Sequence, residues 1–287
     1  KAEVFRRLDA VCKPGAILAS NTSALDLDRI AAFTQRPDSV IGLHFFSPAH
    51  QMRLLEVIRG AATAPDVLAT GLALARRLRK VAVVAGNADG FIGNRMLARY
   101  AAAANGLIDS GASPRQVDRA LENFGFAMGV FRVGDLAGLD IGWATRKRRA
   151  QQDPGRDHAV FADRLCEAGR FGQKTGAGWY RYEAGSRRAE DDPEVAKMLD
   201  AWRSERGHVA RKFGEREILE RCIFALVNEG ARILADGVAQ RAGDIDAVYL
   251  YGYGFPRFRG GPMQYADEVG LPDVVRALRR IAAESPA

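Results

Sequence analysis

The stretch from Val40 to Ile58 reads VIGLHFFSPAHQMRLLEVI and decides the fold, because it holds two apolar runs with one carboxylate inside the second. β-Branched and aliphatic residues predict strands over 40–46 and 54–58. His44 lies near the end of the first run, and Glu56 lies in the middle of the second. An ionised carboxylate alone in an apolar strand would cost several kcal/mol. We therefore expect His44 to be its partner, since a carboxylate behind an imidazole fixes the tautomer and raises the basicity of the ring.

The first hypothesis from this stretch is a general base at His44 that is oriented by Glu56. A second interpretation puts the same residues on a half-exposed edge strand, where the two polar side chains are unrelated. Both interpretations are compatible with the two apolar runs, so the remaining motifs have to decide between them.

Length and composition predict a globular protein with room for two domains. Of the 287 residues, 47% are hydrophobic and 27% are charged, which is the balance of a chain with a large core. No apolar run approaches the length of a membrane span. The three cysteines, Cys12, Cys166 and Cys222, lie far apart and are odd in number. They predict neither a disulfide framework nor a metal site, and they fit a reducing compartment.

The net charge of +7 does not indicate nucleic-acid binding, because the 42 basic residues are spread among 35 acidic ones. The one dense cluster, Arg146–Arg149, has no aromatic stacking motif beside it and is typical of a solvated helix end. We therefore expect no nucleic-acid partner. A basic surface suits anionic small ligands equally well.

Short apolar runs alternate with helical patterns in the first 86 residues. The expected strands are 16–19, 40–46, 54–58 and 80–85, and the expected helices are 1–12, 25–33 and 66–79. Alternation of this kind is typical of a mostly parallel sheet with helices on its faces. Ligands bind such sheets at the carboxyl ends of the strands, where Ser23 and His44 both lie. This position favours a functional role for the histidine.

The character of the chain changes after Asn87, where we place a domain boundary. Long helical patterns over 91–110 and 114–124 follow, and strand patterns largely disappear. Asn94 lies in the first turns of the long helix, where its side chain could reach back into a cleft between domains. The alternative is that Asn94 only caps or decorates the helix.

The last segment of the chain repeats an earlier helical one. The matched pairs are Asp109 and Ala235, Val117 and Ile245, Phe124 and Tyr253, and Asp135 and Asp267, whose numbers differ by 126, 128, 129 and 132. An ordered series with slowly growing offsets indicates an internal duplication with a few small insertions. We expect the two copies to pack on each other about a pseudo-two-fold axis.

A glycine-rich loop over 171–180 places three glycines around a single lysine, Lys174. Glycine lets the backbone approach a ligand closely, which makes Lys174 a candidate for binding an anion or a polar cofactor group. Such a loop can equally mark a turn and nothing more.

Four ordered motifs resemble those of L-3-hydroxyacyl-CoA dehydrogenases. They are Ser20–Ser23, His44–Pro48, Leu54–Ile58 and Gly90–Arg95, and the intervals of 21, 12 and 38 residues between Ser23, His44, Glu56 and Asn94 agree as well. The Lys174 loop and the second helical repeat, with Tyr249–Pro262, also match. The repeat resembles that of multifunctional β-oxidation enzymes of the peroxisomal bifunctional type, in which an enoyl-CoA hydratase/isomerase domain precedes the dehydrogenase.

The resemblance implies an α/β fold, namely the C-terminal part of a Rossmann-like NAD-binding domain followed by an all-α domain made of two repeated helical units. The implied segments are 1–86 for the NAD-binding part, 87–182 for the first helical unit, 183–213 for a linker and 214–287 for the second helical unit. The implied protein is a monomer, because the second copy would cover the surface that a single-copy relative buries in a dimer. The implied compartment is the cytoplasm, or the peroxisome in a eukaryote.

The implied activity is the NAD-dependent oxidation of L-3-hydroxyacyl-CoA to 3-oxoacyl-CoA in fatty-acid β-oxidation. Carried over residue by residue, the resemblance makes His44 the general base, Glu56 its partner, and Ser23 and Asn94 contacts of the substrate. The implied cofactor contacts are Asn21, Ser23, Ser47 and Lys174, and Tyr251 would contact the acyl-CoA. Ser47 is a departure, because many relatives have an asparagine there. This chemistry agrees with the residues themselves, since an alcohol oxidation needs a base whose pKa lies near the working pH.

The sequence contains no G-x-G-x-x-G turn, the motif that binds the pyrophosphate of a dinucleotide. We expect a piece of a longer multifunctional enzyme. The alternative is a chain that lacks its cofactor half and serves as a helical acyl-CoA-binding or assembly module. A third interpretation is a hydroxyacid dehydrogenase with a lysine base on the helix between the domains, and it fits less well because Asn94 and Arg95 stand there.

On its own, the 287-residue chain should bind NAD weakly or not at all, because the turn that holds the pyrophosphate is absent from its sequence. Isothermal titration calorimetry with NAD measures this directly. A micromolar dissociation constant for the isolated chain would contradict the prediction.

Overall fold

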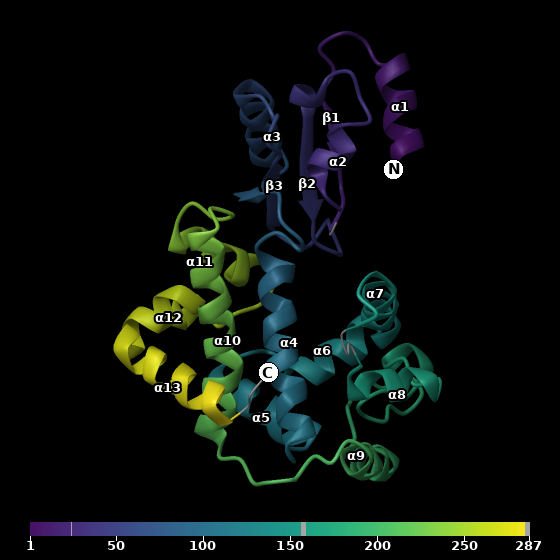
Figure 1. The fold of residues 1–287 in the computed structure, drawn as a ribbon, viewed down its shortest axis with the longest axis vertical. Coiled ribbons are helices and arrows are strands. Elements are labelled where there is room, and N and C mark those ends of the chain that lie inside the picture. Colours follow the sequence, from purple (N-terminus) through teal and green to yellow (C-terminus); the bar gives the residue numbers. More distant parts are fainter. Residues whose placement is uncertain (24, 156–158, 285–287) are drawn as a thin grey trace. The chain divides into compact units, whose positions relative to one another are not determined.

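The computed structural model describes residues 1–23, 25–155 and 159–284, and these form two compact units. The first unit comprises Lys1–Arg99 and Ile223–Ala287, and the second comprises Tyr100–Cys222. Figure 1 shows their elements along the chain. This division follows spatial compactness, and the segment limits derived from the sequence stay a prediction.

A four-stranded sheet is the framework of the first unit. Its strands are β1 (Leu18–Ser20), β2 (Val40–Phe45), β3 (Leu54–Arg59) and β4 (Val81–Gly86), in that order across the sheet. β1 pairs with β2 and β3 with β4 in parallel, whereas β2 and β3 are antiparallel. The predicted mostly parallel α/β sheet is confirmed. The antiparallel pairing sets His44 directly opposite Glu56.

Three helices and a short 3-10 turn accompany these strands: α1 (Ala2–Val11), α2 (Leu27–Ala31), η1 (Pro37–Ser39) and α3 (Pro65–Arg77). α3 covers one face of the sheet, where Leu43 and Leu55 are buried in the same cluster as Val67 of the helix (Figure 1). Side chains alternate along a strand, so His44 and Glu56 point to the other face.

The other face of the sheet meets the C-terminal helices within the same unit. α11 (Ala242–Gly252) contacts β3 and β4. Gly252 lies so close to the sheet that a Cβ atom there would be 2.4 Å from Cδ2 of Leu54. Close approach of this helix therefore requires a glycine, and it places α11 on the side of the sheet that carries the histidine and the carboxylate.

The helical part of the chain consists of two similar series. The first is α4 (Gly93–Asp109), α5 (Pro114–Phe124), α6 (Val130–Ala137) and α7 (Leu139–Gln152), and the second is α10 (Glu215–Ala235), α11, α12 (Pro262–Val269) and α13 (Leu271–Glu284). A 3-10 turn, η3 (Arg257–Arg259), precedes α12.

A buried aspartate in each series demonstrates the duplication. Asp118 of α5 accepts the N–H groups of Phe131 and Arg132 at 2.9 and 3.1 Å, at the start of α6. Asp246 of α11 accepts the N–H group of Met263 at 2.7 Å, at the start of α12. Helices α6 and α12 also end alike, at glycines with φ of 98° and 93°. The two copies therefore share one internal scaffold, as the matched pairs predict.

Burial governs the ionisation of these aspartates. It raises the pKa of Asp118 to about 7, against the hydrogen bonds from Phe131 and Tyr180, which lower it. Burial likewise raises the pKa of Asp246 to about 6. The same physical setting in both copies is a further sign of duplication.

The segment between the two series contains α8 (Phe161–Glu167), η2 (Gln173–Thr175) and α9 (Pro193–Glu205). Its glycine-rich loop wraps around the buried carboxylate of Asp135, which accepts the N–H groups of Trp179 and Tyr180 at 2.9 and 3.0 Å. A Cβ atom on Gly178 would lie 2.0 Å from an oxygen of Asp135. This glycine is required by the packing of the loop.

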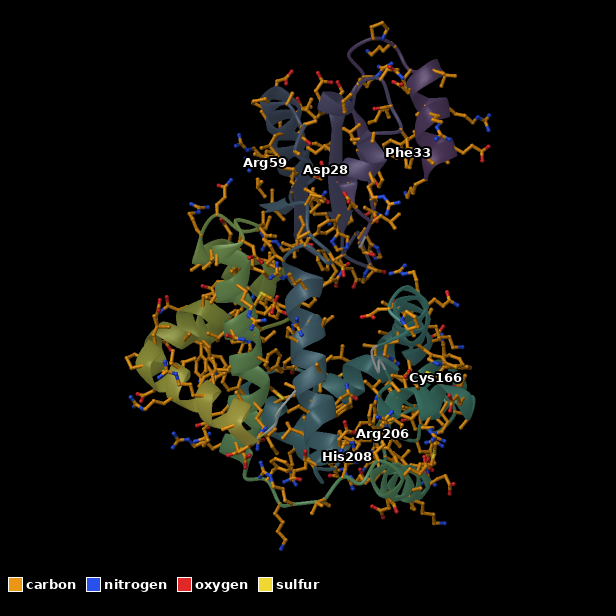
Figure 2. The ribbon with its side chains drawn as sticks, viewed as in Figure 1. Asp28, Phe33, Arg59, Cys166, Arg206 and His208 are labelled. Carbon is orange, nitrogen blue, oxygen red and sulfur yellow. The ribbon has the colours of Figure 1, made fainter. Side chains whose placement is uncertain are left out.

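The predicted linker, residues 183–213, contains helix α9. This helix buries Trp202, whose ring lies under the guanidinium of Arg206. Figure 2 labels this arginine and the buried Cys166, which is a free thiol.

The basic cluster predicted from the sequence lies on α7, where Arg146 pairs with Asp163 at 2.6 Å. The side chain of Arg149 lies outside the described residues. Among the described residues, no helix is both long enough and apolar enough to cross a membrane.

Candidate active site

The centre of the site is a buried hydrogen-bonded pair. Nδ1 of His44 lies 2.7 Å from Oε2 of Glu56, and the two residues are 6% and 0% exposed. β3 is an interior strand of the sheet, so the interpretation as a half-exposed edge strand does not describe these residues. The antiparallel register of β2 and β3 produces the contact, because paired residues on one face of a sheet lie about 5 Å apart.

The start of helix α4 satisfies the second oxygen of the carboxylate. Oε1 of Glu56 accepts the N–H groups of Ile92 and Gly93 at 3.3 and 3.0 Å. Such N–H groups have no partner inside their own helix, and the helix dipole favours a negative charge at this end. With both oxygens accepting, Nδ1 of His44 carries the proton. Its Nε2 is then the basic nitrogen.

A strained turn aims these N–H groups. Phe91 has φ of 53° although it is not a glycine, and Gly90 before it has φ of 76°. The left-handed conformation costs a residue with a side chain roughly 1–2 kcal/mol. Complete burial of the Phe91 ring, 5.8 Å from the imidazole of His44, offsets this cost.

Aromatic rings complete the surroundings of His44. The ring of Phe46 lies 4.6 Å from the imidazole, and Tyr253 packs edge-on against Phe46 at 5.4 Å. An apolar wall of this kind lowers the local dielectric constant, which strengthens the electrostatic coupling between the imidazole and the carboxylate.

Asn94 and Ser23 meet beside this pair. Nδ2 of Asn94 donates to the carbonyl oxygen of Ser23 at 3.4 Å, while Oδ1 of Asn94 accepts a hydrogen bond from the hydroxyl of Tyr253 at 2.8 Å. Asn94 directly follows Gly93, whose N–H binds Glu56. Four residues singled out in the sequence, His44, Glu56, Asn94 and Ser23, therefore belong to one connected cluster within the first unit.

The ends of β1 and β2 carry the remaining polar residues of the cluster. Asn21 follows β1 and accepts the N–H of Phe45 with its amide oxygen at 3.0 Å, which leaves its NH2 group for another acceptor. Ser47 follows β2 and is exposed. Lys80 fixes the loop after Ser47, because its ammonium donates to the carbonyls of Ala49 and Met52.

Asn87 positions the loop that carries Ser23. Its amide oxygen accepts the N–H of Leu27 at 2.9 Å, and its NH2 group donates to Asp26 and Asp28, each at 2.7 Å. The hydrogen bond from Asn87 holds the pKa of Asp26 below its ordinary value. Asp28, labelled in Figure 2, also accepts the N–H of Ala61. The residue that marks the predicted boundary thus ties the end of β4 to the start of α2.

Two predicted site residues stand outside this cluster. Lys174 belongs to the second unit, where its half-exposed ammonium pairs with Asp140 at 2.5 Å. Tyr251 presents its ring to the guanidinium groups of Arg53 and Arg257, at 5.2 and 5.6 Å. The tyrosine that does reach the cluster is Tyr253, which the sequence interpretation missed. Tyr253 follows the last residue of α11 and lies four residues after Tyr249, a spacing that places the two rings on one helix face. This spacing was the feature of the sequence that could have identified Tyr253.

A Rossmann-like sheet with a carboxylate-held histidine, followed by duplicated helices, is the arrangement of dehydrogenases that join a nucleotide-binding domain to a helical one. The family model for the NAD-binding domain of 3-hydroxyacyl-CoA dehydrogenase matches residues 1–88, and the model for its C-terminal domain matches residues 90–182 and 218–287. The chain belongs to the 3-hydroxyacyl-CoA dehydrogenase family.

Individual relatives agree with this assignment. The peroxisomal bifunctional enzyme of Danio rerio is 50% identical over 291 residues, which cover 97% of this chain and 40% of that protein. The chain thus spans about two fifths of the length of the curated relatives that it matches.

Solved structures show the same fold. The 3-hydroxybutyryl-CoA dehydrogenase of Escherichia coli has a TM-score of 0.80 at 23% identity, with 99% of this chain and 76% of that one covered. The dehydrogenase part of multifunctional enzyme 1 from C. elegans has a TM-score of 0.63 at 29% identity, with 89% of this chain and 58% of that one covered.

Replacing Glu56 with glutamine should destabilise the protein and change the tautomer of His44. The neutral amide oxygen can still accept the N–H groups of Ile92 and Gly93, but these bonds lose the negative charge that strengthens them, which should cost about 1–3 kcal/mol. The amide NH2 can then donate to Nδ1, which moves the imidazole proton to Nε2. Urea unfolding measures the first effect, and 15N NMR of the imidazole measures the second.

Glu268→Gln is the matched control, because Glu268 is exposed on α12 of the same unit. It should change the free energy of unfolding by less than about 0.5 kcal/mol. An unchanged tautomer in Glu56→Gln would show that Glu56 does not hold the proton on Nδ1.

Proposed function

We propose that this chain is the dehydrogenase part of a multifunctional β-oxidation enzyme and catalyses the NAD-dependent oxidation of L-3-hydroxyacyl-CoA to 3-oxoacyl-CoA. The observation that carries this proposal is the 2.7 Å hydrogen bond between Nδ1 of His44 and Glu56. It leaves Nε2 as a base beside a half-buried asparagine and an exposed serine. Family membership supports the same reaction.

His44 acts as the general base. Its Nε2 takes the proton of the substrate 3-hydroxyl group, so the ring becomes an imidazolium. Glu56 stabilises that cation, because its carboxylate stays hydrogen-bonded to Nδ1–H throughout. NAD, when bound, accepts the hydride that leaves the same carbon.

Ser23 and Asn94 orient the substrate. The NH2 group of Asn94 lies 3.4 Å from the carbonyl oxygen of Ser23, so the two residues are neighbours. The hydroxyl of Ser23 and the NH2 group of Asn94 would hold the 3-oxygen and the thioester carbonyl in line with the base. Orientation of this kind matters, since a displacement of about 1 Å can cost roughly 10²-fold in rate.

Part of the cofactor site fits the residues present. Asn21, Ser23 and Ser47 are exposed polar residues at the carboxyl ends of β1 and β2, where a Rossmann-like sheet receives the nicotinamide. Because Phe45 binds the amide oxygen of Asn21, the NH2 group would be the part of this side chain that meets the cofactor. We propose that these residues contact the nicotinamide end of NAD, with Lys174 as a further contact and Tyr251 on the acyl-CoA.

The proposed organisation follows the family. The segments 1–86, 87–182, 183–213 and 214–287 would be the NAD-binding part, the first helical unit, a linker and the second helical unit, in support of which the matched models end at 88, 182 and 287. In a eukaryote the enzyme would work in the peroxisome, since the Danio rerio relative is named a peroxisomal enzyme, and otherwise in the cytoplasm. Cell fractionation checks the compartment.

The two helical copies would pack as a pseudo-dimer, which makes the protein a monomer. Light scattering should then give a mass near 31.2 kDa for this chain. A mass near twice that value would contradict the proposal.

A second candidate function is a helical acyl-CoA-binding or assembly module without catalysis. The observation in its favour is the absence of a G-x-G-x-x-G turn from the 287 residues. The two functions separate in one assay of NADH production from a 3-hydroxyacyl-CoA, run on the chain alone and on a form that includes a nucleotide-binding half. A catalytic chain gains activity in the second form, whereas a binding module stays inactive in both.

Replacing His44 with alanine in the complete enzyme should lower kcat by about 10²–10⁴-fold, the usual contribution of a general base, with little change in KM. The rate of NADH formation from a 3-hydroxyacyl-CoA measures both constants. His50→Ala is the matched control, because His50 is exposed on the loop after β2 and should leave turnover near that of the wild type. Near-normal turnover of the His44 variant would refute the assignment.

A further inference from the structure

We propose that Tyr253 is a positioning residue that fixes the orientation of the Asn94 amide and thereby aims its NH2 group at the substrate. This inference rests on the proposed dehydrogenase function and extends it to a residue of the second helical repeat. Its basis is the 2.8 Å hydrogen bond from the hydroxyl of Tyr253 to Oδ1 of Asn94.

The partners at the two ends of the amide determine which way it faces. A backbone carbonyl, that of Ser23, lies 3.4 Å from one end, and a carbonyl can only accept a hydrogen bond. That end of Asn94 must therefore be the NH2 group, and the end beside Tyr253 must be the oxygen. The tyrosine hydroxyl is then the donor.

Tyr253 is suited to be a permanent donor. Burial raises its pKa well above the ordinary value for tyrosine, and the charge of Glu56 adds to this effect. The phenol consequently keeps its proton over the whole pH range in which an imidazole base works. Asn94 is offered the same hydrogen bond in every protonation state of His44.

Packing holds the phenol ring in place. The ring stacks on Tyr249 at 4.9 Å with an interplanar angle of 20°, and it meets Phe46 edge-on at 5.4 Å. It also fills the space beside Gly93, where a Cβ atom would lie 2.4 Å from Cε2 of Tyr253. Phe46 in turn lies 4.6 Å from His44, so the same ring links the amide to the wall of the base.

The duplication supplies an internal comparison. Tyr253 aligns with Phe124 of the first copy, which is buried and has no hydroxyl group. Both copies thus keep a large ring at this point, after which the chain turns at a glycine with positive φ, Gly125 or Gly254. Packing accounts for the ring in both copies. The hydroxyl of Tyr253 is the difference between them, and its contact is Asn94.

Loss of this hydroxyl should free the amide to rotate while the ring packing remains. One N–H of Asn94 already makes only a long contact with the carbonyl of Ser23, so the other N–H is the one available to a substrate oxygen. An amide that rotates presents its oxygen to the substrate part of the time. The cost should therefore fall on the oriented complex, and so mainly on kcat.

The test uses Tyr253→Phe in the complete enzyme, with steady-state rates of NADH formation from a 3-hydroxyacyl-CoA. We expect kcat to fall about 10- to 100-fold, with KM changed less than about threefold. The matched control is Tyr249→Phe, which removes a hydroxyl from the adjoining ring, where it makes only a 3.5 Å contact with the carbonyl of Gly93. It should keep kcat within about threefold of the wild type. Equal effects of the two variants would overturn the proposal.

A double-mutant cycle with Asn94→Ala shows whether Tyr253 acts through the asparagine. Once the amide is gone, adding Tyr253→Phe should cause no further loss, whereas a merely structural role would lower kcat again by the same factor. The latter result would overturn the proposal.

A readout without turnover separates this proposal from the proposed reaction. Tyr253→Phe should shift the side-chain 15N NMR signal of Asn94, and Tyr249→Phe should not. Unshifted amide signals would overturn the positioning role even in an active enzyme. Shifted signals in a protein without dehydrogenase activity would leave the amide contact standing and would refute the reaction.

Discussion

The buried carboxylate of Glu56 is the constraint on which the rest of the first unit depends. An unpaired carboxylate at 0% exposure would cost several kcal/mol, so three donors have to converge on it. They come from two different places: the imidazole of His44 on β2, and the N–H groups of Ile92 and Gly93 at the start of α4. One charge therefore fixes the register of β2 on β3, the entry of the first long helix and the tautomer of the base. The left-handed backbone at Phe91 is retained because that turn is what aims the two N–H groups.

The second helical copy takes part in this arrangement within the first unit. Gly252 of α11 approaches Leu54 on β3, and Arg95 on α4 pairs with Glu229 and Asp236 at 2.6 and 2.7 Å. Both ion pairs involve helix α10 or the residue after it, so within the first unit the C-terminal helices are tied to α4, at whose start Glu56 is bound. Glu229 is buried whereas Asp236 is half exposed, so loss of Arg95 would be costly mainly at Glu229, whose buried charge would lose this partner. The duplicated helices therefore support the site as well as enclosing a core of their own.

Much of this could be predicted from the sequence, for reasons that differ between residues. Glu56 could be singled out because a carboxylate in an apolar strand has few physical solutions. The helical repeat could be detected because the matched residues keep their order with slowly growing offsets, and in the structure Asp118 and Asp246 cap equivalent helices. The antiparallel direction of β3 had no local signal, since an apolar run reads the same in either direction. The spacing of Tyr253 from Tyr249 indicated a shared helix face, but its hydrogen bond to Asn94 had no local signal, because that partner lies 159 residues away. The glycines around Lys174 suggested a ligand, whereas at Gly178 the reason is the buried carboxylate of Asp135.

The carboxylate and its hydrogen-bond donors lie within a short span of the chain. His44, Glu56 and the two N–H donors at the start of α4 all lie between residues 44 and 93. The geometry of the imidazole is thus set by strand register and helix entry. For the proposed general base, pre-organisation of this kind would cost no rearrangement when substrate arrives, because the carboxylate already fixes the tautomer of the ring. Ser23 and Asn94, the residues proposed to orient the substrate oxygen, are the more exposed members of the cluster, as a contact with an incoming ligand requires.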